Sequence, residues 1–383
     1  MLDRRLFLLV GALVLVEVMF YAVLTPLLPY YAEHLHLSKA QAGVLSAFYA
    51  FGTIVFSVPA GFLVGRIGAR STVVVGIVLL AASSLAFGFL KSVAGLDAAR
   101  CLQGVGGSCL WAGGLVWLVT SAVPEQRGEV VGTALGVGIA GALLGPVLGA
   151  AATVTSPELV FSSIALVIAL LGVWALAMPA SPPGQANTLR ELAAAARHDA
   201  RMWAGLWFTA LPSVVFGVLE VLAPLRLSAL GAGAAAIAAT FVVAAGIEAT
   251  LSPVFGRLSD RHGPMRVARI GLAVSAVTTV CVALPGAALA LAITVVAACV
   301  AAGSPWVPAS SLLSAGASDY GLGQGIAFAL WNLAWATGQA IGAAGGATVA
   351  HATADAVPYV VLAVVCLATV LTTRAPTPER AQA

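Results

Sequence analysis

Three carboxylates lie deep inside long apolar stretches of the sequence, and they are the side chains best placed to do chemistry. They are Glu17, Glu220 and Glu248. An ionised side chain at membrane depth is costly, so it normally faces a cavity or a partner and marks a functional site. A carboxylate in such a site can hold a proton while the site is empty and release it when a cation arrives. The alternative for each is a neutral, hydrogen-bonded acid with a structural role only.

The composition places these carboxylates in a membrane protein. Of the 383 residues, 61% are hydrophobic and 9% are charged, and the mean hydropathy is +1.03. Soluble proteins carry about a quarter charged residues. Apolar runs long enough to cross a bilayer follow one another almost end to end, which predicts an all-α polytopic membrane protein of about twelve spans. We expect the spans near residues 6–30, 41–63, 71–92, 95–122, 129–152, 158–179, 202–227, 233–256, 266–285, 287–312, 320–347 and 354–373.

The basic residues predict the orientation of the chain. If both termini face one side of the membrane, the connections on that side hold nearly all of the arginines. The opposite side then holds only Lys39, Lys91 and Arg226. The positive-inside rule therefore predicts that both termini are cytoplasmic.

Two pieces of sequence recur and predict two related halves. The segment Gly61–Arg70 is similar to Gly256–Arg266, which begins 195 residues later. A second set recurs 197 residues later: Gly141, Gly145 and Gly149 return as Gly338, Gly342 and Gly346. We expect six-span halves at 1–185 and 202–383, joined by a cytoplasmic linker at 186–201 that forms a short helix or is disordered. Parallel halves of this kind place a substrate site near the bilayer midplane.

Arg100 lies deeper inside a predicted span than any other basic residue. Asp97 precedes it by one helical turn and Gln103 follows it by one turn, so the three side chains share a face. They form either a structural pair near the outer end of the span or a polar line that takes part in proton coupling. Tyr21 lies one turn after Glu17 and shares its face in the same way.

Aromatic side chains gather near the predicted carboxylate sites. Trp331 and Trp335 share a face of the eleventh span with Asn332 beside them, and Trp306 lies between two prolines of the tenth span. Aromatic rings near carboxylates suit a lipophilic cation, which they bind through cation–π contact and area burial. Tryptophan is also common at membrane interfaces, and that alternative stays open for these residues.

The fifth predicted span carries a stripe of small residues. Gly141, Gly145 and Gly149 repeat every four residues and let another helix approach closely. Pro146 disrupts the local hydrogen-bond ladder and can bend the helix. The stripe is either a packing surface or a gate between the halves.

Several motifs together resemble those of the major facilitator superfamily. They are Gly61–Arg70, its copy Gly256–Arg266, the run Leu96–Gly106, and the glycines of the fifth span, Gly132 included. The glycine pattern of the fifth span is similar to that of the superfamily's proton-coupled exporters, with an alanine in place of the usual last glycine. The resemblance implies the twelve-span fold, transport by alternating access, and a role for Arg100 in polarising the coupling path.

The repeated loop has an implied role as well. The resemblance implies that Asp260 and Arg261 latch one conformation by contact with the N-terminus of a facing helix, where the helix dipole favours an acid. Arg66 stands in the first-half copy, which has Gly65 where the acid belongs, so we expect a weaker latch there. A topology signal without a latch is the alternative.

Two stretches resemble the vesicular amine transporters more closely. They are Glu17–Pro29 and Leu219–Pro224. The resemblance implies that Glu17 and Glu220 bind a cationic amine or take part in proton exchange.

The chain also departs from the pattern of those transporters. The acids of their tenth and eleventh spans align with Gly303 and Asn332, and the lysine of their second span aligns with Tyr49. Glu248 is an additional acid. These departures indicate a bacterial relative and not a monoamine specialist.

Together these features predict a proton-coupled secondary transporter of the bacterial cytoplasmic (inner) membrane that exports small lipophilic organic cations or drug-like compounds. We expect a monomer driven by the proton gradient, with no other cofactor, no nucleic-acid partner and no enzymatic activity. The histidines show no metal-ligand spacing, so we expect no metal site. Two alternatives stay open: a proton-linked importer or facilitator of a neutral solute such as a sugar or metabolite, and a non-transporting membrane receptor.

Overall fold

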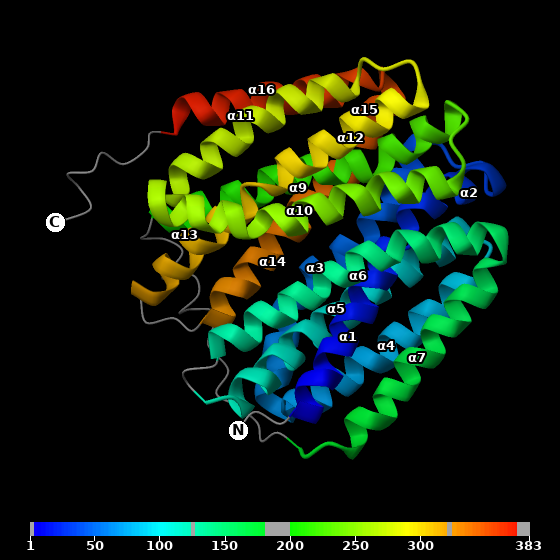
Figure 1. Cartoon of the computed structure of the whole chain (residues 1–383). Helices are drawn as coiled ribbons and strands as arrows, with labels where there is room; N and C mark the ends of the chain where they lie inside the picture. The colour runs from blue at the N-terminus through cyan, green and yellow to red at the C-terminus, as the bar shows by residue number, and fades with distance from the viewer. Residues whose placement is uncertain (1–3, 124–126, 181–199, 320–323, 374–383) are drawn as a thin grey trace. The chain divides into compact units, whose positions relative to one another are not determined.

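The computed structural model describes residues 4–123, 127–180, 200–319 and 324–373 (Figure 1). Helices dominate these residues, and no strand occurs in the described ranges. The chain divides into two compact units. Unit 1 contains Met1–Thr188 and Ala232–Val242, and unit 2 contains Leu189–Gly231 and Val243–Ala383. The predicted linker helix falls almost entirely outside the described residues.

The helices of the first part of the chain follow the predicted spans. They are α1 (Arg4–Ala22), α2 (Leu24–His34), α3 (Lys39–Ile67), α4 (Ala69–Phe89), α5 (Val93–Ser121), α6 (Arg127–Val154) and α7 (Pro157–Ala177). The α1 and α2 helices together form a single apolar segment, Arg4–His34, long enough to cross a membrane. All six spans predicted before residue 180 therefore have a helical counterpart.

The helices of the second part are less regular. They are α9 (Ala200–Ala229), α10 (Ala234–His262), α11 (Pro264–Val282), α12 (Ala288–Gly303), α13 (Trp306–Asp319), α14 (Gln324–Ala340), the π-helix η2 (Ile341–Gly346), α15 (Ala347–Ala352) and α16 (Ala356–Thr372). The described residues contain ten helical segments that meet both length and hydropathy for a span, and α12 with α13 form one of them. The last two predicted spans correspond to the α14–η2–α15 run and to α16. The all-helical membrane fold is confirmed.

Local sequence explains where several helices begin and end. Ser38 caps α3 in a capping box with Gln41, because each side chain bonds the backbone N–H of the other. Gly68 and Gly263 follow α3 and α10 with φ of 85° and 83°, a conformation that glycine adopts without strain. These glycines hold the same place in the two copies of the repeated loop, so the repeat encodes the same sharp turn twice.

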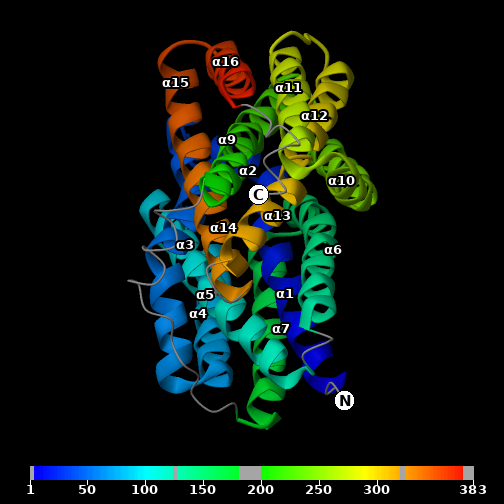
Figure 2. The same cartoon turned by 90° about the vertical axis from the view of Figure 1, so that its left-hand side faces the viewer.

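In unit 1, α1 packs closely against α6, while α5 packs against both α3 and α4 (Figures 1 and 2). The glycine stripe of α6 is the reason for the first contact. A Cβ on Gly141 would lie 2.5 Å from the carbonyl oxygen of Leu15, and a Cβ on Gly149 would overlap the carbonyl oxygen of Val23. Glycine at these positions lets the two backbones touch.

In unit 2, α9 packs against α14 and η2 in the same manner (Figure 2). A Cβ on Gly338 or Gly342 would overlap the backbone of α9 at Ala210 or Val214. The π-helix follows directly, and π-helical turns of this kind are frequent at functional sites. Both units therefore bring their first helix into close contact with a glycine-bearing partner helix, and each first helix carries one of the predicted carboxylates.

Candidate functional site

Glu17 of α1 lies in the core of unit 1, where its side chain is 1% exposed. Both of its carboxylate oxygens accept hydrogen bonds. The Tyr49 hydroxyl of α3 donates to Oε1 at 2.5 Å, and the Trp111 indole of α5 donates to Oε2 at 3.0 Å. Three helices thus supply the carboxylate and its two neutral donors.

A glycine makes room for this carboxylate. Gly107 of α5 is buried, and a Cβ built on it would lie 2.7 Å from Glu17 Oε1 and 3.1 Å from the Tyr49 hydroxyl oxygen. The absence of a side chain at Gly107 is therefore part of the geometry of the site.

Arg100 lies beside this cluster, and it is 3% exposed. Its guanidinium carbon is 5.4 Å from the Tyr21 ring centroid and 5.3 Å from that of Tyr49, within the range of a cation–π contact. The two tyrosine rings lie 4.6 Å apart. Arg100 Nη1 also donates to Gln103 Oε1 at 2.7 Å. The cation is thus held among aromatic rings and an amide close to Glu17.

Asp97 does not join this group through an ion pair. Among the described residues no ion pair links Asp97 to Arg100, and the buried Oδ1 of Asp97 has no hydrogen-bond partner there. The polar line along α5 therefore runs from Arg100 through Gln103, and the structural Asp97–Arg100 pair considered from sequence is not formed.

Unit 2 holds a second carboxylate site. The Gln339 amide of α14 donates a hydrogen bond to Glu220 Oε2 of α9. Gln339 is 2% exposed, and Glu220 is partly buried. Glu248 of α10 is partly buried as well, and its carboxylate lies against Gly303 of α12.

An aromatic cluster lies in the same unit. The rings of Phe216 and Trp306 are stacked with centroids 4.7 Å apart, and Trp331 meets Trp306 edge-on at 6.3 Å. Stacked rings of this kind offer a flat apolar surface to an aromatic ligand. Asn332 and Trp335 lie on the same helix as Trp331 and are partly buried.

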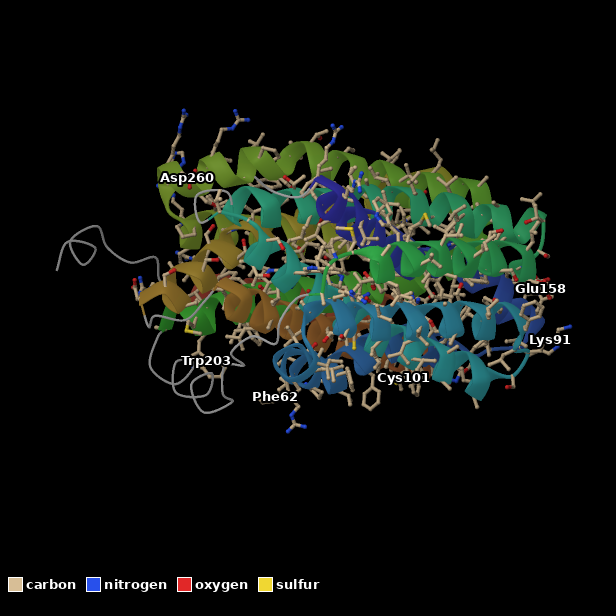
Figure 3. All side chains as sticks on the ribbon, turned by 90° about the horizontal axis from the view of Figure 1, so that it is seen from below. Phe62, Lys91, Cys101, Glu158, Trp203 and Asp260 are labelled. Carbon is tan, nitrogen blue, oxygen red and sulfur yellow. The ribbon has the colours of Figure 1, made fainter. Side chains whose placement is uncertain are left out.

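The predicted gating residues fall at two kinds of position. Pro146 is buried within the glycine stripe of α6. Arg66, Asp260 and Arg261 are exposed at the ends of α3 and α10. Figure 3 places Asp260 at the same end of unit 2 as Trp203.

Comparison with known proteins identifies the family. The sequence model of the Major Facilitator Superfamily matches residues 10–326 and 228–383. The chain belongs to the Major Facilitator Superfamily. It is therefore a multi-pass membrane protein of this superfamily.

Relatives within the superfamily match parts of the chain. The synaptic vesicular amine transporter of Homo sapiens is 34% identical over 133 residues, which cover 33% of this chain and 26% of that protein. Multidrug resistance protein 1 of Bacillus subtilis is 26% identical over 161 residues, 41% of each chain. The MFS-type transporter ppzB of Metarhizium majus is 32% identical over 139 residues, 35% of this chain. The chain thus covers only 30% of the length of that curated relative.

Solved structures of the superfamily share the fold over the whole chain. A D-xylose–proton symporter superposes with a TM-score of 0.77 at 17% identity, covering 97% of this chain and 98% of the symporter. A bacterial homologue of the human lysosomal transporter Spinster gives a TM-score of 0.78 at 13% identity, covering 96% and 95%. At these identities the likeness shows the superfamily fold alone.

Sequence reasoning had missed several members of the two clusters. Trp111, Gln339 and Phe216 supply direct contacts but were not among the predicted site residues. Phe216 lies one turn before Glu220 on α9, so the i, i+4 spacing could have found it. Gly107 carried no such signal, because its role depends on contact with another helix.

Proposed function

We propose that this superfamily member is a proton-driven antiporter that exports small lipophilic organic cations across the cytoplasmic membrane of a bacterium. One observation carries the proposal. The carboxylate of Glu17 is almost fully buried in unit 1, and both of its oxygens accept hydrogen bonds from neutral donors. A buried carboxylate with neutral donors can exist with or without a proton, which is the requirement for proton coupling.

Arg100 supplies the electrostatic setting for this proton. Its cation lies against the Tyr49 ring, and the Tyr49 hydroxyl bonds to Glu17. A change in the charge of Glu17 is thereby transmitted to Tyr49 and Arg100. Residues that share one buried network respond together, because charges interact strongly where water is excluded.

In the proposed cycle, Glu220 and the aromatic cluster of unit 2 receive the substrate. Glu220 offers a carboxylate held by the Gln339 amide, and the Phe216–Trp306 stack offers apolar area for the ring system of a lipophilic cation. A cation bound near aromatic faces gains cation–π energy in addition to area burial. The superfamily's alternating access then exposes the bound compound to either side of the membrane in turn.

The functions for which two relatives are named support the same substrate class. One is a vesicular amine transporter and another is a multidrug resistance protein.

The arginine-rich connections support cytoplasmic termini. In unit 1, Lys91 and Glu158 lie together at one end, whereas Phe62 lies toward the other end (Figure 3). A monomer is the proposed functional state.

The test uses purified protein in liposomes that enclose a pH-sensitive dye. A proton gradient is imposed, and lipophilic amines are added one at a time. We expect an added amine to drive proton movement in the wild type. The Glu17→Gln and Glu220→Gln variants should each lose at least about 90% of that movement, because a glutamine side chain cannot exchange a proton as a carboxyl group does. A tenfold loss of this kind corresponds to about 1.4 kcal/mol. Glu33→Gln, an exposed carboxylate on α2, is the matched control and should behave as the wild type.

Three results would contradict the proposal. Normal coupled transport in Glu17→Gln would remove Glu17 from the coupling mechanism. Proton movement with neutral solutes such as sugars, and none with cations, would indicate the importer or facilitator function instead. Binding of amines without any flux would indicate a receptor.

A further inference from the structure

Asp97 of α5 is a partly buried carboxyl group that has no partner within the described residues. Its Oδ1 is enclosed by protein, and neither of its oxygens has a hydrogen bond or an ion pair there. An acid inside a span normally marks a functional position. A carboxyl group that is cut off from water without a partner is unfavourable when ionised, so this arrangement suits a neutral, protonated Asp97.

Arg100 stands midway between Asp97 and Gln103. One of them precedes it by three residues and the other follows it by three, so both lie one turn away on the same face of α5. Arg100 Nη1 donates to Gln103 Oε1 at 2.7 Å. Rotation about the side-chain bonds of Arg100 carries its guanidinium from Gln103 to Asp97, with the helix unchanged. Asp97 Oδ1 and Gln103 Nε2 flank the arginine, and both are enclosed and unsatisfied within the described residues.

The hydrogen bonds at Glu17 match its ionised form. The Tyr49 hydroxyl and the Trp111 indole both donate, one to each carboxylate oxygen. An ionised carboxylate only accepts hydrogen bonds, whereas a protonated one also has a hydrogen to donate. Arg100 interacts electrostatically with this carboxylate, so Glu17 supplies a negative charge that accompanies the buried arginine. A proton on Glu17 removes that charge, and a buried cation that loses its counter-charge is strongly destabilised.

The helices around α5 bring no further carboxyl group to this face among the side chains that the structure describes. α5 packs against α1, α3, α4 and α6. Arg70, the charged residue of α4, lies toward the other end of α5, where Ala69 meets Gly113. α6 has no charged residue from Gly132 onward. The titratable groups that do meet this face of α5 are Glu17 and Tyr21 of α1 and Tyr49 of α3.

We propose that Asp97 is the alternate counter-ion of Arg100, and that Asp97 and Glu17 hold one proton between them. This inference rests on the proposed function, since it adds a residue to the same coupling network. In the arrangement that the structure shows, the proton is on Asp97 and Arg100 accompanies the ionised Glu17. In the other arrangement, the proton has left Asp97 and reached Glu17 through water, and Arg100 has turned to the ionised Asp97. Each arrangement contains one carboxylate, one carboxylic acid and one arginine, so the total charge is conserved.

The place of Asp97 gives this exchange a direction. α5 begins at Val93, after the connection that holds Lys91, and the distribution of arginines puts that connection on the outside. Asp97 therefore takes up a proton from the side on which the gradient supplies it, and Glu17 releases one on the other side. Arg100 follows the negative charge from one acid to the other, so Asp97 is a positioning residue that acts through Arg100.

A thermodynamic cycle tests the exchange without any transport. Glu17→Gln imitates a permanently protonated Glu17, so Arg100 should already be paired with Asp97 in this variant. Asp97→Asn should therefore lower the thermal unfolding temperature by at least about 4 °C in the Glu17→Gln background, where it removes the remaining carboxylate from a buried arginine. In the wild-type background, where Glu17 is present, it should lower that temperature by no more than about 1 °C. The temperatures are measured by differential scanning fluorimetry on purified full-length protein in detergent.

Asp97→Glu is the matched variant, because it keeps a carboxyl group one turn from Arg100. In the Glu17→Gln background its unfolding temperature should stay within about 2 °C of that of Glu17→Gln alone. If Glu17→Gln with Asp97→Asn fails to fold while Glu17→Gln with Asp97→Glu folds, the missing carboxylate is the cause and the exchange is supported. Failure of both double variants to fold would overturn it.

Transport gives a second readout, in the dye-loaded liposome assay. Asp97→Asn should reduce the maximal rate of coupled proton movement at least about tenfold and leave the half-maximal amine concentration unchanged, because Asp97 acts on the proton and not on the substrate. Asp97→Glu should keep at least about half of the wild-type rate. Glu33→Gln, at an exposed position on α2, should behave as the wild type.

The outcomes separate this inference from the proposed function. A small effect of Asp97→Asn on the unfolding temperature in both backgrounds would mean that Arg100 does not turn to Asp97, and a large effect in both would make Asp97 a structural residue. Either result would overturn the exchange, as would a changed half-maximal amine concentration at an unchanged maximal rate. Coupled proton movement that is lost in Glu17→Gln would still support the antiporter. If Glu17→Gln transports normally while the cycle shows the expected difference, the coupling proposal fails and the exchange of Arg100 between two acids stands.

Discussion

Gly107→Ala is the sharpest test of the Glu17 cluster, because it changes no charge and removes no hydrogen-bonding group. The new Cβ would lie 2.7 Å from Glu17 Oε1, whereas ordinary contacts begin at 3.4 Å. The carboxylate must therefore move by about 0.7 Å, the difference between these two distances. The Tyr49 and Trp111 bonds, at 2.5 and 3.0 Å, hold it from two other helices. A shift of this size weakens or breaks at least one of them.

The magnitude follows from the value of a hydrogen bond to a charged group, about 1.5–3 kcal/mol. This range corresponds to a loss of about 10- to 150-fold in an equilibrium constant. We expect Gly107→Ala to weaken the apparent substrate affinity for coupled proton movement by a factor within that range. The assay is the dye-loaded liposome experiment, run over a series of amine concentrations. Size-exclusion chromatography of the purified variant confirms that it is folded.

Gly11→Ala is the matched control, since it lies on the same helix as Glu17 and its Cβ would meet nothing within 4 Å. It should transport as the wild type does. If Gly107→Ala also transports with wild-type affinity, then the close seating of Glu17 against α5 has no part in coupling. The reasoning from this geometry would then be refuted.

Two further predictions concern stability. Gly342→Ala would press a methyl group into the α9 backbone at Val214, so the thermal unfolding temperature of the protein should fall by several degrees. Gly345→Ala is the control, because its Cβ would meet nothing within 4 Å, and it should leave that temperature unchanged. Arg70 donates a hydrogen bond of 2.8 Å to the backbone carbonyl of Met178, directly after α7. Arg70→Leu should therefore lower the free energy of unfolding by about 1 kcal/mol and the unfolding temperature measurably. Arg66→Leu, at an exposed position, should have little effect. Equal unfolding temperatures within either pair, measured by differential scanning fluorimetry, would contradict the corresponding prediction.

Much of the unit 1 cluster could be predicted from sequence, because its members are marked by chemical type. A carboxylate, an arginine and a glutamine stand out in apolar helices, and the one-turn spacing of Tyr21 from Glu17 places both on one face. The structure brings Tyr49 and Arg100 into the same group. What a single helix cannot encode is the neighbour across a packing interface. Trp111 and Gly107 contact Glu17 only because α5 lies against α1.

The same limit explains what was missed in unit 2. Gln339 and Glu220 are 119 residues apart, and their contact depends on how α14 packs against α9. The seat of Glu248 over Gly303 likewise joins α10 to α12. The π-helix at Ile341–Gly346 lies within a predicted continuous span, because hydropathy measures length and polarity but not the hydrogen-bond register. Residue type predicted which side chains matter, and packing decided which of them meet.

The two units use one packing device and two different chemistries. Each brings its carboxylate-bearing first helix against a glycine stripe, at Gly141 in unit 1 and at Gly338 in unit 2. In unit 1 each oxygen of the Glu17 carboxylate accepts a hydrogen bond from a fixed donor and an arginine lies nearby, so a bulky ligand would have to displace several buried contacts to reach it. In unit 2 one carboxylate has no partner among the described residues, and an aromatic stack lies in the same unit. This difference supports a division of roles in the proposed cycle, with the proton held at Glu17 and the organic cation received in unit 2.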